Sequence, residues 1–284
     1  MTAQVLVATK TDPKARIVSF WSGPVSYMER MSAKSIRCQG HDLTVYSYTP
    51  QILHDGGLEG DIRDARDVLA LTGEHERLAA ASPAVLADIF RLELMRQNRG
   101  VWLDLDMLMV APLIAPAGPI FAVEGPRGAI NNAALYLPAD SKLLADMSAF
   151  VAARPVRAPW WTGKRRLKHA FWATVRRPIP PEDCQWGVFG PKALTWFVDQ
   201  NGMRAVAAAP ETFYPVSWND RAKLVSKDDV WRLCTHETVA VHLWANGLRK
   251  LIATSGVERE SFLAQMARSL DEELPKAALQ RVPM

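Results

Sequence analysis

The stretch from residue 82 to residue 113, SPAVLADIFRLELMRQNRGVWLDLDMLMVAPL, constrains this chain more than any other. Its first half carries the signals of a helix start. Ser82 can serve as N-cap, and Pro83 suits the first helical position, where a backbone N–H has no partner. Asp88 and Arg91 lie three residues apart and therefore on one side of this helix. Apolar residues recur at helical spacing and predict its buried face, namely Val85, Leu86, Ile89, Phe90 and Leu92.

A short buried strand follows this helix. The period changes after Gly100, and residues 101–103 (VWL) predict a strand that ends in Asp104-Leu105-Asp106. Alternation aims Asp104 and Asp106 the same way and turns Leu105 into the core. Two neighbouring carboxylates repel each other unless a cation or a shared proton intervenes. A divalent metal would resolve this repulsion, and oxygen ligands favour Mg²⁺ or Mn²⁺. An exposed turn after a strand is the alternative interpretation.

The helix and the strand together carry a more specific signal than the aspartates alone. The chain reads A-D-x-x-R from residue 87 and G-V-[aromatic]-L-D-x-D from residue 100. This pattern resembles the sugar-binding DXD region of a glycosyltransferase superfamily. That group includes the vertebrate α-1,4-galactosyltransferases, the yeast initiating α-1,6-mannosyltransferase and, more distantly, the clostridial glucosylating toxins. The resemblance implies an α/β fold of GT-A type, with a Rossmann-like mixed sheet flanked by helices and a C-terminal helical tail.

The resemblance also implies roles for the residues of this region. Asp106 would bind the metal directly, and Asp104 would contact the ribose, or the metal through water. Both are assigned as catalytic residues. Asp88 and Arg91 would hold hydroxyl groups of the donor sugar, and Arg91 would also keep Asp88 ionised. We also place Leu103 in the donor-binding set.

The first strand offers a nucleotide-binding edge. Residues 17–21 (IVSFW) are rich in β-formers and precede a turn. In doubly wound sheets ligands gather at the carboxyl ends of strands, which places Phe20, Trp21 and Ser22 at such an edge. From the residues alone, Trp21 is equally a core aromatic. The resemblance favours stacking of Trp21 on the nucleotide base.

Two further segments contribute candidate ligands. Residues 129–137 predict a strand with Asn131 and Asn132 near its start; buried amides need partners, so these are turn residues or ligands of sugar hydroxyls. Residues 239–244 (VAVHLW) predict a last strand with His242 and Trp244 on one face. A histidine on an apolar strand is usually a core residue, but this strand resembles the family's C-terminal H-x-W. An imidazole beside two carboxylates suits Mn²⁺, and the indole N–H of Trp244 could hold a phosphate or glycosidic oxygen.

One departure from the family bears on the donor pocket. The family usually has Gly-Gly-[Val/Ile]-Tyr before the DXD motif, whereas this chain has Arg99-Gly100-Val101-Trp102. Glycine at the first position would permit a left-handed backbone, which arginine resists, so we expect a different exit from the helix. Trp102 in place of tyrosine removes a hydroxyl group.

The remaining elements predict alternating helices and strands. The strand–helix–strand unit at the N-terminus implies a right-handed crossover and a parallel sheet. Residues 50–81 show no clean period, and His54 and His75 receive no role. Further helices are predicted over 25–38, 140–153 and 192–200, and further strands over 43–48, 107–110 and 120–124.

Composition excludes several classes. The chain has 284 residues, 49% hydrophobic and 23% charged, which is typical of one globular domain spanning 1–284. A net charge of +4 does not favour nucleic-acid binding, and three cysteines without C-x-x-C spacing favour neither a disulfide framework nor zinc. The chain shows no secretory signal and no apolar run of roughly 18 residues, so we expect a cytoplasmic location.

Residues 154–181 form a basic aromatic insertion, and a C-terminal helix is expected within 256–276. The insertion is either a solvated basic surface or a peripheral contact with the inner membrane surface through residues 160–177, where basic and large aromatic side chains alternate.

The sequence therefore predicts a metal-dependent hexosyltransferase that uses Mn²⁺ or Mg²⁺ and a UDP- or GDP-linked donor. By resemblance it retains the anomeric configuration, and we prefer a front-face route because no nucleophile stands out. The acceptor is expected to be a glycan or a lipid-linked glycan, with surface polysaccharide synthesis as the working hypothesis. Two alternatives stay open: a non-catalytic nucleotide-sugar-binding module and a metal-dependent phosphatase.

Overall fold

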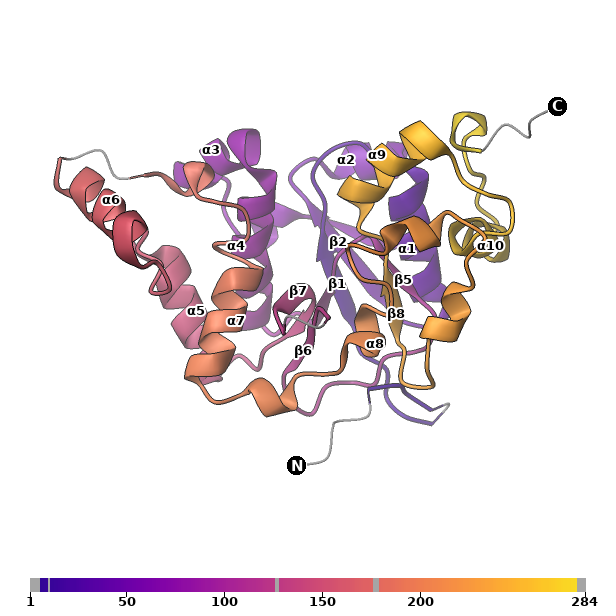
Figure 1. Cartoon of the computed structure of the whole chain (residues 1–284), viewed down its shortest axis with the longest axis horizontal. Helices are drawn as coiled ribbons and strands as arrows, with labels where there is room; N and C mark the ends of the chain where they lie inside the picture. Colours follow the sequence, from indigo (N-terminus) through magenta and orange to yellow (C-terminus); the bar gives the residue numbers. More distant parts are fainter. Residues whose placement is uncertain (1–5, 10, 126–127, 176–178, 280–284) are drawn as a thin grey trace.

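The computed structural model describes residues 6–9, 11–125, 128–175 and 179–279 (Figure 1). Its centre is a six-stranded sheet of order β3-β2-β1-β4-β7-β6. The first four strands are parallel, β7 runs antiparallel to β4, and β6 runs antiparallel to β7. The strands are β1 (Ile17–Phe20), β2 (Leu43–Ser47), β3 (Asp61–Asp64), β4 (Val101–Leu103), β6 (Ile120–Val123) and β7 (Ile130–Tyr136).

Helices cover both faces of this sheet (Figure 1). Alternate residues of β1 and β4 point to opposite faces, so that Val18 and Trp102 pack in one buried cluster while Ile17 and Leu103 pack in the other. The first cluster includes residues of α3 (Glu74–Ala81), α4 (Pro83–Arg96), α5 (Lys142–Ala152) and α7 (Pro191–Gln200). The second includes residues of α1 (Tyr27–Cys38), α9 (Ala245–Ser255) and α10 (Phe262–Ser269). The expected α/β class, a mixed sheet flanked by helices, is confirmed.

A second, two-stranded antiparallel sheet joins the centre of the chain to its C-terminal part. It pairs β5 (Met107–Met109) with β8 (Ala240–His242), and Met107 lies opposite His242. The remaining helices are α2 (Pro50–Asp55), α6 (Gly163–Thr174) and α8 (Pro210–Phe213). Within the described residues, no helix has both the length and the apolar character that a bilayer crossing requires.

The region without a clear sequence period, residues 50–81, contains α2, β3 and α3. Strand β3 lies at the edge of the sheet and alternates exposed and half-buried residues. Its charged residues are typical of an edge strand, where they oppose pairing with another chain. The strand was missed because such a sequence carries no apolar alternation.

Three local predictions need correction. Ser82 occupies the N-cap position of α4, but its side chain makes no capping hydrogen bond. In the apolar stripe of α4, Leu86, Phe90 and Leu92 are buried, whereas Val85 and Ile89 are only half-buried. The helix expected within 256–276 is limited to α10, and Val257 instead pairs with Leu279.

The exit from α4 explains how the chain tolerates Arg99. The left-handed residue is Asn98, with φ of 49°, and asparagine adopts this conformation more easily than most residues. Gly100 follows with φ of 150°, and an added Cβ would lie 2.6 Å from the carbonyl oxygen of Arg16. The parallel register of β4 on β1 enforces this approach, because the N–H of Val101 donates to the same carbonyl. Gly100 is therefore the glycine that the β1–β4 pairing requires.

We expect Gly100→Ala to lower the free energy of unfolding by about 2 kcal/mol or more, because the new methyl group would push β4 away from β1. Urea unfolding measures this. Gly118→Ala is the matched control, since an added Cβ there meets no atom within 4 Å. The control should change the free energy of unfolding by less than about 1 kcal/mol. An equal loss of unfolding free energy in both variants would show that the close contact between Gly100 and Arg16 does not require glycine.

Candidate active site

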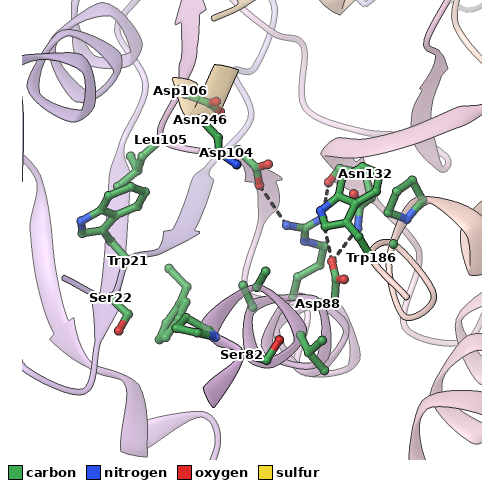
Figure 2. A pocket seen from close by; sticks show the side chains of 18 of the residues that line it. Trp21, Ser22, Ser82, Asp88, Asp104, Leu105, Asp106, Asn132, Trp186 and Asn246 are labelled. Atoms are coloured by element: carbon green, nitrogen blue, oxygen red, sulfur yellow. Dashed lines mark hydrogen bonds and ion pairs between the residues drawn. The ribbon is translucent and has the colours of Figure 1, made fainter. Parts of the chain in front are cut away.

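A cavity of about 570 Å³ lies at the carboxyl ends of β1 and β4 (Figure 2). Four other elements contribute to its wall: the first half of α4, Asn132 of β7, the loop that leads into α7, and the start of α9. This is the edge at which the sequence placed the nucleotide, as expected for the end of parallel strands. Eight predicted residues line the cavity, namely Phe20, Trp21, Ser22, Asp88, Arg91, Asp104, Asp106 and Asn132.

The Arg91 guanidinium organises one side of the cavity. It is 5% exposed and donates to Asp104 Oδ1 at 2.9 Å and to the carbonyl oxygen of Asn132 at 2.7 Å. Its central carbon lies 4.4 Å from the ring centroid of Trp102, close enough for a cation–π contact. The indole N–H of Trp102 donates to Asp104 Oδ1 at 2.6 Å. Trp102 therefore holds the first aspartate in place.

Asp106 has a different set of partners. Its Oδ1 lies 3.1 Å from Nε2 of His242, and its Oδ2 accepts the N–H of Ala245 at 2.9 Å. That N–H belongs to the first turn of α9, whose positive dipole end favours a carboxylate. Leu105 is buried between the two aspartates as expected, but β4 ends at Leu103, and residues 104–106 form a turn in which the N–H of Met107 donates to the carbonyl oxygen of Asp104.

These partners separate the acidities of the two carboxyl groups. Burial raises the pKa of Asp104 above its ordinary value, and this effect outweighs the charge of Arg91. Burial would also raise the pKa of Asp106, but His242 and the Ala245 N–H together hold it below its ordinary value. Burial opposes the charged imidazole, yet Asp106 raises the pKa of His242 overall. The expected repulsion between the aspartates is thus offset within the chain, by Arg91 beside one and His242 beside the other.

Asp104, Asp106 and His242 could hold a divalent metal. One ligand atom from each lies within 4.8 Å of the others. Two carboxylates and an imidazole are hard and intermediate donors, which suit Mn²⁺. Nδ1 of His242 is buried and has no hydrogen-bond partner among the described residues. Nδ1 can therefore accept a further partner. The three side chains together fit a metal ion.

Asp88 forms a second polar group next to Arg91. Its Oδ1 accepts the side-chain N–H of Asn132 at 2.9 Å and lies 3.5 Å from Nη1 of Arg91. Burial raises the pKa of Asp88 to about 6, although Arg91 and Asn132 both oppose this shift. The structure thereby brings the predicted sugar-binding pair and Asn132 together at one end of the cavity (Figure 2).

Three predicted donor-binding residues, Leu103, Asn131 and Trp244, do not line the cavity. Leu103 is fully buried in the core on β4. Asn131 is the neighbour of Asn132 on β7, so its side chain points to the other face of the strand. There it donates to Glu124 at 2.9 Å and accepts the N–H of Ala133 at 2.8 Å. Asn131 is thus a satisfied structural residue, while Asn132 is the candidate ligand.

Trp244 also differs from the prediction. Strand β8 ends at His242, and Trp244 adopts a left-handed backbone with φ of 56° at the start of α9. Its indole N–H donates to the carbonyl oxygen of Val216 at 2.9 Å, so this donor is not offered to a phosphate or glycosidic oxygen. The ring centroids of Trp244 and His242 lie 3.9 Å apart. Trp244 therefore packs against the imidazole and fixes its position.

Several lining residues were not identified from the sequence. Asn246 and Arg249 belong to α9, and Trp186 lies in the loop before α7 with 73% of its surface exposed. Gly190 ends that loop: a Cβ there would lie 2.6 Å from both carboxylate oxygens of Asp88 and 2.7 Å from the Asn132 amide nitrogen. The Gly-Pro pair before α7 was the available signal for Gly190, and its role is to let the loop close on Asp88.

No protein-family model matches this sequence, and no curated protein matches it. Among solved structures, one titled "PaToxG Glycosyltransferase" is similar, with a TM-score of 0.45 and 14% sequence identity. The similarity covers 67% of this chain and 71% of that chain. At this level of similarity, we infer function from the geometry of this chain's own residues.

The raised pKa of Asp88 predicts that ionisation of this carboxyl group lowers the free energy of unfolding. Because the folded state holds the Asp88 proton more tightly than the unfolded state, stability falls as pH rises from the ordinary carboxyl range through about 6. We expect Asp88→Asn to be more stable than wild type at neutral pH by about 1–3 kcal/mol, and equal to it at about pH 4. Urea unfolding across this range, without metal, measures the difference. Asp140→Asn changes an exposed carboxyl group outside the cavity and should show the same dependence of unfolding free energy on pH as the wild type. If Asp88→Asn also showed the wild-type dependence, the pKa of Asp88 would not be raised.

Proposed function

We propose that this chain is a metal-dependent glycosyltransferase of GT-A type that transfers a hexose from a UDP- or GDP-linked sugar to a glycan or lipid-linked acceptor. The observation that supports this most is the meeting of two groups at one cavity, which is lined by Asp88, Arg91, Asp104, Asp106 and Asn132, while His242 pairs with Asp106 without lining it. The group formed by Asp104, Asp106 and His242 fits a metal, and the group formed by Asp88, Arg91 and Asn132 presents hydrogen-bonding atoms beside it.

The order of these groups matches the order of parts in a nucleotide sugar. In Figure 2, Trp21 lies across the cavity from Asp88 and Asn132, and the aspartate pair lies between them. A nucleotide sugar presents a base, a diphosphate and a hexose in the same sequence. We therefore orient the donor with its base on Trp21 and its hexose toward Asp88.

Cleavage of the sugar–phosphate bond builds negative charge on the departing diphosphate. A divalent cation held by Asp104, Asp106 and His242 would act there as a Lewis acid. The chain fixes these ligands in advance: Arg91 and Trp102 orient Asp104, while the Ala245 N–H orients Asp106. Arg249 lines the same region, where its guanidinium pairs with the buried Glu29.

The hexose end of the cavity would set the sugar's position. Arg91 and Asn132 are donors, and an ionised Asp88 is an acceptor, so the group can bind hydroxyl groups of either polarity. Gly190 brings backbone against Asp88 and limits the space for the sugar. We propose a retaining, front-face reaction, in which these residues orient the donor without forming a covalent intermediate.

Trp186 supports an acceptor position at the same end. A tryptophan with 73% of its surface exposed leaves a large apolar face in water beside the hexose position. Aromatic faces of this kind pack against the C–H face of a sugar ring, while the indole N–H remains free to contact polar atoms. We therefore place the incoming glycan against Trp186.

The two alternatives differ from this proposal in specific ways. A phosphatase that uses a D-x-D pair as nucleophile and acid expects a small hydroxyl residue shortly after the second aspartate. Here Met107, Leu108 and Met109 follow and are buried in β5. A binding module without turnover would keep metal-dependent nucleotide-sugar binding but would show neither transfer nor donor hydrolysis.

Thermal shift with UDP- and GDP-sugars, with and without Mn²⁺, distinguishes these functions. For a glycosyltransferase, one donor class stabilises the protein only when the metal is present. Stabilisation reaches about 2.7 kcal/mol at a ligand concentration one hundred times Kd. Slow hydrolysis of the same donor then separates an enzyme from a binding module, and stabilisation by phosphomonoesters alone would favour the phosphatase.

Asp106→Asn is expected to abolish metal-dependent donor binding and turnover while the fold is retained. An amide keeps an acceptor for the Ala245 N–H but supplies no charge to a cation. If repulsion from Asp104 were the only effect, removing the charge of Asp106 would stabilise the metal-free protein. Because Asp106 also pairs with His242, Asp106→Asn loses that interaction, and we expect no gain in the free energy of unfolding. Asp140→Asn serves as the control, and Mn²⁺-dependent turnover in Asp106→Asn would overturn the metal assignment.

Trp21→Ala tests the orientation of the donor. Stacking of a base on an aromatic ring contributes about 1–3 kcal/mol, so the affinity for the nucleoside diphosphate should fall by roughly 10- to 100-fold. Calorimetry with UDP and GDP in the presence of Mn²⁺ measures this. Trp231 is a half-exposed tryptophan outside the cavity, so Trp231→Ala should bind UDP or GDP with wild-type affinity. Unchanged affinity together with lost stability in Trp21→Ala would make Trp21 a core residue instead.

A further inference from the structure

The positive charge of this chain is concentrated in one segment. Residues 154–181 contain eight lysines and arginines and no aspartate or glutamate, so the rest of the chain carries a net charge of −4. Within this block Arg154 pairs with Glu74, while an excess of one sign over the remaining residues attracts an oppositely charged surface. The catalytic cavity does not use these basic residues.

The aromatic start of this segment is attached to the protein core. Trp161 is buried, and the ring centroid of Trp160 lies 5.3 Å from that of Phe150 on α5 and 6.1 Å from that of Trp196 on α7. Trp161 therefore does not belong to the exposed surface, contrary to expectation, and Trp160 is half-buried against the core. They fix the root from which α6 extends at the outer margin of the molecule (Figure 1).

Helix α6 presents a row of apolar side chains to solvent. Leu167 and Phe171 are 71% and 61% exposed, and Val175, at the C-terminal end of the helix, is 45% exposed. Single exposed apolar residues are common, but these three are spaced four residues apart and therefore lie along one face. This face is unfavourable in water and indicates a contact.

Exposed lysines lie along the same face. Lys164 and Lys168 are four residues apart, and each lies three residues before Leu167 or Phe171. Arg166 is exposed on the opposite flank of the apolar row. The side chains of Arg165 and His169, and residues Arg176 and Arg177, lie outside the described part of the chain and contribute only their sequence charge.

We propose that α6 binds the surface of an anionic lipid bilayer. An apolar stripe beside lysines is the arrangement of helices that lie in the headgroup region, with the stripe toward the acyl chains and the ammonium groups toward lipid phosphates. A nucleic acid would neutralise the lysines but would leave Leu167 and Phe171 in water. The bilayer is the partner that satisfies both features of this face. From α6 the chain continues to Cys184 and Trp186, so binding would hold the cavity near the lipid surface.

Co-sedimentation tests this proposal independently of the enzymatic one. The probes are vesicles of phosphatidylcholine alone and of phosphatidylcholine mixed with phosphatidylglycerol, at low and high ionic strength. We expect the wild type to bind only the anionic vesicles and to dissociate at high salt. Each lysine near an anionic surface contributes about five-fold to partitioning, so Lys164→Ser/Lys168→Ser should bind about 30-fold more weakly. Leu167→Ser/Phe171→Ser should lose binding at all salt concentrations.

Matched variants elsewhere on the surface control for charge and hydrophobicity. Lys227→Ser/Lys250→Ser makes the same change in net charge at exposed positions outside the segment, and Ile52→Ser/Leu233→Ser removes two other exposed apolar side chains. Both controls should bind like the wild type, and all variants should keep the same metal-dependent binding of UDP or GDP as wild type. Absence of wild-type binding, equal binding to neutral vesicles, or equal loss in the controls would each overturn the proposal.

Discussion

The buried guanidinium of Arg91 is the interaction on which the candidate site depends. Arg91 comes from α4, Asp104 from the end of β4 and the Asn132 carbonyl from β7, so a single cation ties three elements together at one edge of the sheet. Removing a buried cation would leave two carboxylates, Asp88 and Asp104, without their opposite charge, and burial alone already raises the pKa of both. Arg91 therefore supports the packing of α4 on the sheet and also favours the ionised forms of Asp88 and Asp104.

The second aspartate depends on a different part of the chain. Asp106 leads into β5, and the register of β5 on β8 places Met107 opposite His242. Strand β8 then turns through the left-handed Trp244 into α9, whose first N–H, that of Ala245, donates to Asp106. One strand pair and one helix start thus deliver an imidazole and a backbone donor to a single carboxylate. The two halves of the D-x-D pair are consequently held by two different polar environments.

The sequence predicted most elements because their apolar periods are strong. Helix α4, strands β4 and β7, and the candidate residues of α4 and β4 follow from local spacing and helix-start signals. The edge strand β3 was not predicted because its residues are mostly charged and show no apolar period. The partners of buried polar side chains were not predicted where they lie far away in the sequence. Asn131 and Asn132 are indistinguishable by type, and only the register of β7 against β4 and β6 decides which of them meets Asp88. The role of Gly190 likewise depends on how closely the α7 loop approaches α4.

The sequence by itself determined that Asp88 and Arg91 share a face of their helix and that Asp104 and Asp106 directly follow a buried strand. It also determined that residues 154–181 carry the excess positive charge. Only the tertiary structure decided that His242, 136 residues after Asp106, pairs with it, and that the Trp244 indole N–H is satisfied by a backbone carbonyl. The reason is physical: side-chain direction within an element follows from local geometry, whereas the partner of a buried polar group is set by which distant segments pack against it.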